Sequence, residues 1–314
     1  MLLLEAVEEF LLDGQAGGWS PGTVAAYRWH LQRWVTWLQA RQVVVVAGLT
    51  RRLLREWSAG LTWAPATRKG AVTAVRSLLR WVAAEEQLDA DLVKVLRLPK
   101  VPRRLQRTLT AVEVVKLLDV CGQPVEHGVT AGVARLLCVR NAALVALLYD
   151  SLLRAAELCA LQVADLDLER GLVTVRCGKG GAGRRAPFGR ETAVLLGAWL
   201  AVHPSSTMLF VALGGLEPGA GLTVSGLRLI LRHLGTRAGV AGVTSHAFRR
   251  GGAVACTLNG APGRLVQLWA GWSDERMLAT YTRALDSDAA ALDAYAPFSP
   301  VGAAVRKCAL TLDG

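Results

Sequence analysis

Several kinds of protein are disfavoured by what the 314-residue sequence lacks. The six cysteines are scattered without any CxxC pair, so neither a disulfide framework nor a zinc site is indicated. No uninterrupted apolar run approaches about 18 residues, which makes a membrane span unexpected. The start, "MLLLEAVEEFLL", contains glutamates and no basic segment, so it predicts an amphipathic helix and not a signal peptide. A protein of the reducing cytoplasm is the default expectation.

Acidic residues are also in short supply relative to basic ones. The chain has 36 Lys and Arg against 25 Asp and Glu, which gives a formal net charge of +11. A strongly basic soluble protein favours a polyanionic partner, most often nucleic acid and less often an acidic membrane surface. The plainer alternative is a basic surface that serves solubility.

The first hundred residues have the pattern of packed helices. Ser20 and Pro21 form a helix start, and Val24, Leu31 and Leu38 follow on one face. A second helix is predicted within "PATRKGAVTAVRSLLRWVAAEE". Most of the ten tryptophans fall before residue 82, which suits a small helical bundle with large core side chains. Core packing is favoured over base stacking for them.

A break separates this region from the rest of the chain. Residues 99–107 contain two prolines and a cluster of positive charge, which is typical of a linker. Its Lys100, Arg103 and Arg104 fit a path along a phosphate backbone or, alternatively, a solvated hinge. Thr110 and Glu113 then form a capping box that opens a new helical domain.

Within the second domain one stretch departs from helical periodicity. The segment "GLVTVRCGKGGAGRRAPFGR" alternates β-branched residues, reaches a glycine-rich turn and becomes extended again, so it predicts a β-hairpin with Lys179 at its turn.

Three separated segments contain residues suited to one chemistry. We interpret "LLYDSLLRAAEL" as an apolar helix that ends in Arg154, with Glu157 three residues later. The second segment is the hairpin with Lys179. The third, "SHAFRRGG…GWSDERMLATYTR", contributes His246, Arg249, Trp272 and Tyr281. Each residue also has an ordinary explanation: a structural histidine, a surface ion pair, a hydrophilic turn, or a tryptophan that fills a core.

Elementary chemistry connects these residues. His246 and Arg249 are one helical turn apart and therefore share a face. Arg154 and Arg249 would supply two planar guanidinium groups for the nonbridging oxygens of one phosphate. A phosphodiester gains equatorial negative charge as it becomes five-coordinate, so such donors stabilise the transition state more than the ground state.

In their order and spacing these residues resemble the tyrosine recombinase (phage integrase) family, most strongly from Thr110 to about Leu285. The Trp after Gly271, where His is more usual, resembles the Cre branch. The resemblance implies a mainly α, two-domain DNA clamp: an N-terminal helical bundle with a SAM-like core-binding fold (1–98), a basic linker (99–107) and an α-rich catalytic domain with a small β-hairpin or sheet (108–314).

The resemblance also implies a mechanism. Tyr281 would attack the scissile phosphate, Lys179 would protonate the leaving oxygen, and His246 would take part in proton transfer. Glu157 would orient His246 or Arg154, and Trp272 would donate its indole N–H. No cofactor, ATP or metal is implied, in agreement with the absence of a GxxxxGK[ST] loop and of clustered carboxylates.

The implied partner is double-stranded DNA at specific recombination sites, bound by a homotetramer that passes through a Holliday junction. In the N-terminal domain we expect the DNA-facing side chains to be Arg68, Lys69 and Arg76. A type IB topoisomerase and a non-catalytic DNA-binding relative are the alternatives. Two departures remain: Leu152 stands where the family usually has Gly, and Arg184 and Arg185 compete with Lys179 as the active cation of the hairpin.

Overall fold

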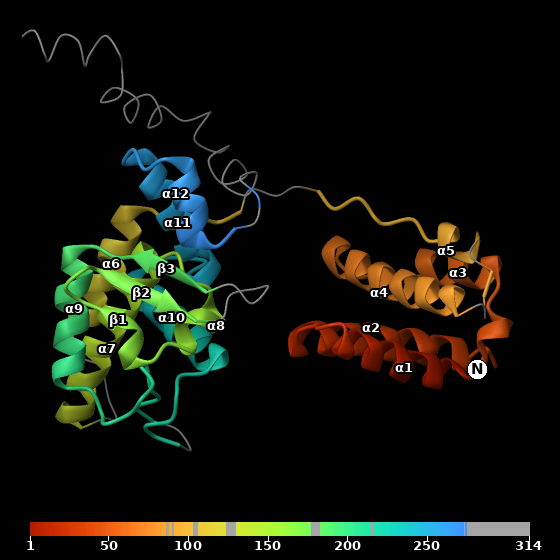
Figure 1. The fold of residues 1–314 in the computed structure, drawn as a ribbon, viewed down its shortest axis with the longest axis horizontal. Helices are drawn as coiled ribbons and strands as arrows, with labels where there is room; N and C mark the ends of the chain where they lie inside the picture. Colours follow the sequence, from red (N-terminus) through yellow and green to blue (C-terminus); the bar gives the residue numbers. More distant parts are fainter. Residues whose placement is uncertain are drawn as a thin grey trace, which may run out of the picture. The chain divides into compact units, whose positions relative to one another are not determined.

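The fold consists of two compact units, Met1–Arg104 and Leu105–Gly314 (Figure 1). It is known from a computed structural model, which describes residues 1–85, 88–89, 91–102, 106–123, 130–176, 183–214, 217–272 and 274. The domain boundaries inferred from the sequence, 98 and 108, stay predictions. Each unit is described by itself.

Helices form the first unit. In chain order they are α1 (Leu3–Ala16), α2 (Pro21–Gln39), the 3-10 helix η1 (Val46–Gly48), α3 (Arg51–Ala59), α4 (Pro65–Ala84) and α5 (Asp91–Val95). Ser20 accepts the backbone N–H of Thr23 at the start of α2, as its sequence predicts. Trp34 and Trp57 lie in the core, whereas Trp29 is 43% exposed, so core packing does not account for every tryptophan.

The second unit is mainly helical with a small sheet. Its elements are α6 (Ala111–Gly122), α7 (Ala131–Asp150), α8 (Ala155–Cys159), η2 (Val163–Asp165), β1 (Leu166–Asp167), β2 (Leu172–Val175), β3 (Arg184–Pro187), α9 (Arg190–Ala201), α10 (Val224–Ala238), α11 (Ser245–Leu258) and α12 (Gly263–Ala270). The predicted capping box of Thr110 and Glu113 is present at the start of α6. The mainly helical fold class is therefore confirmed.

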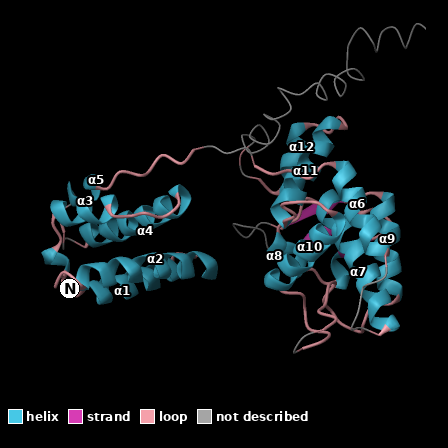
Figure 2. Cartoon of the chain, turned by 180° about the vertical axis from the view of Figure 1, so that it is seen from behind, coloured by secondary structure: helices cyan, strands magenta, loops and turns pink. Residues whose placement is uncertain are grey.

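The sheet is antiparallel, in the order β1-β2-β3. Its strands, magenta in Figure 2, lie among the helices of the second unit. Strands β2 and β3 are the two arms of the predicted hairpin, with Val173 paired to Ala186. Strand β1 is an addition that the sequence did not indicate, because two residues are too few to produce an alternating pattern.

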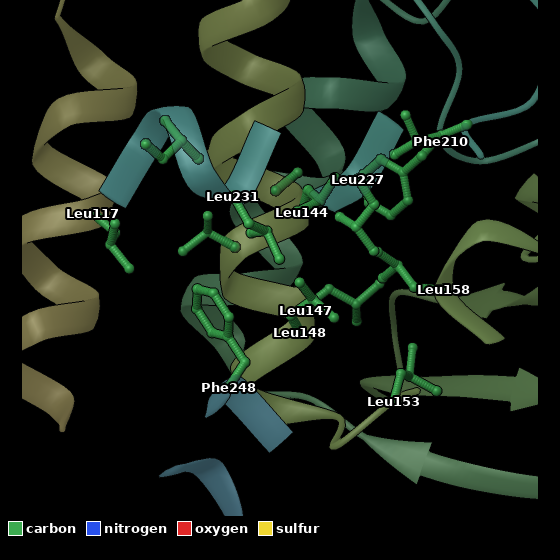
Figure 3. Packing of buried hydrophobic residues seen from close by; sticks show 14 of the residues in the cluster. Leu117, Leu144, Leu147, Leu148, Leu153, Leu158, Phe210, Leu227, Leu231 and Phe248 are labelled. Atoms are coloured by element: carbon green, nitrogen blue, oxygen red, sulfur yellow. The ribbon is translucent and has the colours of Figure 1, made fainter. Parts of the chain in front are cut away.

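Helix α7 runs through the centre of the second core, where Leu144, Leu147 and Leu148 pack with Phe248 of α11 and Leu231 of α10 (Figure 3). Among the described residues, α7 is the one helix long and apolar enough to cross a membrane by length and composition. Its place in the core accounts for that composition, since it packs against α6, α9 and α11.

Two glycines allow α11 to approach its neighbours closely. A Cβ at Gly251 would lie 2.1 Å from the carbonyl oxygen of Leu109, and one at Gly252 would lie 2.0 Å from that of Tyr149. A larger residue at Gly251 would therefore push α11 away from the segment before α6, and one at Gly252 would push it away from the end of α7. These contacts fix the helix that carries His246 and Arg249, and α12 lies beside it (Figure 1).

Candidate active site

Arg154 begins a helix, and the expectation that it ends one is wrong. Helix α7 stops at Asp150, and Arg154 is the N-cap residue of the short helix α8. The break occurs at Leu152, whose φ of 55° places it in the left-handed region. No glycine or proline announces this break in "DSLLRAAEL", which explains why the sequence pattern suggests a continuous helix.

Leu152 is an unusual residue for that backbone conformation. The left-handed region costs a residue with a Cβ roughly 1–2 kcal/mol, which is why glycine is common there. Leu152 is fully buried in a cluster with Ala253, Val266 and Ala270, and burying a leucine side chain contributes about 1.5–3 kcal/mol. Apolar packing therefore offsets the strain. The carbonyl of Leu152 accepts a hydrogen bond from Nη1 of Arg249.

Glu157 lies at the centre of the charged groups. Its Oε1 accepts from Nη1 of Arg154 at 2.6 Å and from Nη1 of Arg184 at 2.9 Å. Its Oε2 accepts from the backbone N–H of Arg154 and from Nη2 of Arg184, both at 2.7 Å, and lies 4.0 Å from Nη1 of Arg249. Burial opposes ionisation of the carboxyl, but the hydrogen bonds from Arg184 and Arg154 outweigh it and lower the pKa of Glu157 to about 2.

Arginine side chains donate hydrogen bonds to the C-terminus of α12, and they are the three that surround Glu157. Gly271, with φ of 61°, ends the helix in a Schellman motif, in which Trp272 and Gly271 donate to the carbonyls of Gln267 and Leu268. The next three carbonyls each accept a guanidinium N–H. Trp269 accepts from Arg184, Ala270 from Arg249 and Gly271 from Arg154. Positive side chains thus satisfy the groups that a helix end leaves without partners.

His246 occupies the same face of α11 as Arg249, as the spacing predicts. It is an exposed residue, and it lines a hollow of about 440 Å³ with Ala155, Arg228 and Arg250. Partial burial of the ring and the positive charges of Arg250, Arg249 and Arg154 lower the pKa of His246. The imidazole is therefore mostly neutral near pH 7, the state that can accept a proton.

The part of this pKa shift that comes from neighbouring charges can be measured. Arg250→Gln is expected to raise the pKa of His246, because removing a nearby cation makes the imidazolium less unfavourable. An NMR titration of the His246 ring signals would report it. Arg232→Gln, an exposed arginine of α10 in the same unit, is the matched control. An unchanged midpoint in the Arg250 variant would show that the charge of Arg250 does not lower the pKa of His246.

The structure brings together five of the seven residues predicted to be catalytic. Arg154 and Arg249 each form an ion pair with Glu157, the Trp272 ring lies 5.3 Å from Cζ of Arg249, and the charges of both arginines act on His246. Lys179 and Tyr281 lie outside the described residues. In the parts of the chain that are described, no group of three His, Cys, Asp or Glu side chains is placed to hold a metal ion.

Four of the predicted DNA-contacting residues are described, and all four belong to the first unit. Arg68, Lys69 and Arg76 lie on α4 of the first unit, and Lys100 is exposed in an irregular segment. Arg103 and Arg104 are not among the described residues.

Sequence reasoning missed the structural place of Arg184, which it treated only as a rival to Lys179. The strand period offers a signal for it. Arg184 shares a face of β3 with Ala186, which is buried, whereas Arg185 points to the opposite face and is exposed. Arg228 and Arg250, which line the hollow beside His246, were also missed.

Comparison with known proteins identifies the fold and the family of the chain. The fold is similar to that of lambda integrase (75-356), whose dimer bound to a COC′ core site superposes with a TM-score of 0.69 at 15% identity, over 90% of this chain and 95% of that one. The chain belongs to the phage integrase family, whose profile matches residues 107–288.

Two relatives show the sequence similarity along the chain. Tyrosine recombinase XerC of Xanthomonas campestris pv. campestris is 34% identical over 76% of this chain and 70% of its own length. Tyrosine recombinase XerA of Thermococcus kodakarensis is 29% identical over 89% of this chain and 90% of its own. Both are Xer proteins, so the family is confirmed, while assignment to a Cre-like branch is not.

Proposed function

We propose that this protein is a site-specific DNA recombinase that cleaves and rejoins strands through a 3′-phosphotyrosyl intermediate and a Holliday junction. One observation carries the proposal: Arg154 and Arg249 are held at the end of α12, with His246 close enough to be influenced by both charges. Membership of the phage integrase family supports the same reading.

The chemistry assigns one role to each predicted residue. The phenolic oxygen of Tyr281 attacks phosphorus and the bond to the 5′ oxygen breaks, with the phenolic proton passing to His246 and a proton from Lys179 to the leaving oxygen. Arg154, Arg249 and the indole N–H of Trp272 face the charge that develops on the nonbridging oxygens. A 5′-hydroxyl then reverses the step. The scheme needs no ATP, metal or other cofactor.

The partner in this proposal is double-stranded DNA, bound at two specific sites by a homotetramer in the cytoplasm, at the nucleoid. The domains 1–98 and 108–314, joined by 99–107, act as a clamp. Their DNA-contacting residues are Arg68, Lys69, Arg76, Lys100, Arg103 and Arg104. These side chains are suited to phosphate contacts, which position a protein without reading sequence. Trp272 in place of the more usual His is the reason to propose a Cre-like variant.

The proposal is tested with DNA recovered from random duplexes by binding selection. A nicked suicide duplex with the selected site should trap a denaturant-resistant protein–DNA adduct, and two copies on one plasmid should yield recombinants and junction intermediates. Relaxation of supercoils by a monomer without junctions would assign the chain to type IB topoisomerases. Binding without any adduct would assign it to non-catalytic relatives.

A further inference from the structure

Arg184 directs its hydrogen bonds into the protein. Its Nε donates to the carbonyl of Trp269 at 2.8 Å, and its two Nη atoms donate to the two carboxylate oxygens of Glu157. The side chain is 11% exposed, compared with 29% for Arg154. Its planar fork is therefore engaged with a carboxylate, which is the geometry that guanidinium groups prefer.

We propose that Arg184 is a positioning residue for DNA cleavage: it fixes Glu157, and through Glu157 it fixes Arg154 against the end of α12. This inference rests on the proposed recombinase function. Arg184 and Arg154 donate to the same atom, Oε1 of Glu157, so any rotation of that carboxylate moves the partner of Arg154.

Charge balance gives Arg184 a second effect at the same place. Glu157 is ionised and lies beside Arg154 and 4.0 Å from Arg249, so it attracts both arginines that would face the phosphate. The bidentate pair with Arg184 neutralises much of this negative charge. The field of Arg154 and Arg249 is then directed towards an incoming anion and less towards Glu157.

Gly271 supplies an independent geometric observation. A Cβ at this position would lie 3.0 Å from Cδ of Arg184 and 3.1 Å from its Cζ and Nε. The guanidinium of Arg184 is thus packed against the backbone of Gly271, whose carbonyl accepts from Arg154. The turn at Gly271 therefore positions both Arg184 and Arg154, and it leaves no room for a side chain at residue 271.

Arg184→Lys tests this role, because lysine keeps the charge but cannot form the planar fork. We expect single-turnover cleavage of the suicide duplex to be about 10-fold to 100-fold slower, as for a reacting group misplaced by about 1 Å, with DNA affinity within about twofold of native. Arg185→Lys, the exposed neighbour on the opposite face of β3, is the matched control and should cleave at the native rate. A native cleavage rate for Arg184→Lys, or an equal loss of affinity and cleavage, would contradict the proposal.

A double-mutant cycle separates positioning from a direct role. If Arg184 acts through Glu157, the effect of Arg184→Lys should shrink to less than about threefold in a Glu157→Gln background. If Arg184→Lys reduced the cleavage rate by the same factor in both backgrounds, Arg184 would act elsewhere, for example on the phosphate itself.

Gly271→Ala provides a second variant should the lysine variant not fold. This variant retains Arg184 in the sequence but places a Cβ against its guanidinium. We expect slower cleavage with retained DNA affinity. A native rate there contradicts the role of Arg184. Failure of the native protein to form any adduct is a different result, since it contradicts the proposed function and not this residue assignment alone.

Discussion

Tyr281→Phe is expected to abolish the covalent protein–DNA adduct while DNA affinity stays within about twofold of native, because the change removes only the oxygen that attacks phosphorus. The measurement is denaturing electrophoresis of the protein with a nicked suicide duplex, next to a binding titration on the intact duplex. Cleavage without this oxygen has no covalent route, so the expected loss is complete.

Two other tyrosines provide controls for this substitution. Tyr27 lies in the first unit, with its hydroxyl 3.5 Å from Oγ of Ser77. Tyr149 is at the end of α7, where burial raises the pKa of its phenol to about 12 and makes it a poor nucleophile. Tyr27→Phe and Tyr149→Phe should therefore retain adduct formation. Adducts that persist in Tyr281→Phe would assign the nucleophile to another residue.

Glu157→Gln is expected to lower the free energy of unfolding at pH 7 by about 3 kcal/mol, the value that corresponds to a carboxyl pKa lowered from 4.5 to about 2. The amide has nearly the same shape but no charge to offset the arginines around it. Urea unfolding followed by circular dichroism would measure the loss, with the exposed Glu191→Gln of α9 as the control.

The pH dependence of that difference follows from the direction of the pKa shift. A lowered pKa in the folded protein means that the carboxylate stabilises the fold above its ordinary pKa of 4.5, and that this contribution is lost as pH falls towards about 2. The difference in unfolding free energy between the native protein and Glu157→Gln should therefore become smaller from pH 5 to pH 3. A constant gap over this range would mean that the ionised form is not what stabilises the site.

Features that depend on local sequence could be predicted well. Ser20 at the start of α2 and the pair Thr110 and Glu113 at the start of α6 are correct, because capping requires only neighbouring residues. The common face of His246 and Arg249 follows in the same way from helical spacing. The family motif located Arg154 and Glu157 but not the backbone around them.

Features that depend on distant contacts could not be predicted. The left-handed conformation of Leu152 is stabilised by Ala253, Val266 and Ala270, about a hundred residues later in the chain. The partner of Arg184 is likewise fixed by tertiary packing, since a chain with many arginines offers several equivalent candidates for Glu157. A local sequence pattern does not show which arginine pairs with the carboxylate of Glu157.

The three carbonyls at the end of α12 also decide whether arginine side-chain entropy is lost when the protein folds or when it binds DNA. Long arginine side chains lose up to about 2 kcal/mol of rotamer freedom when they are immobilised. Arg154 and Arg249 are hydrogen-bonded to Gly271 and Ala270 without DNA. Their rotamer entropy is therefore lost when α12 folds and not when DNA binds. The affinity for the transition state is thereby linked thermodynamically to the docking of one short helix, whose buried Val266 and Ala270 pack against Leu152.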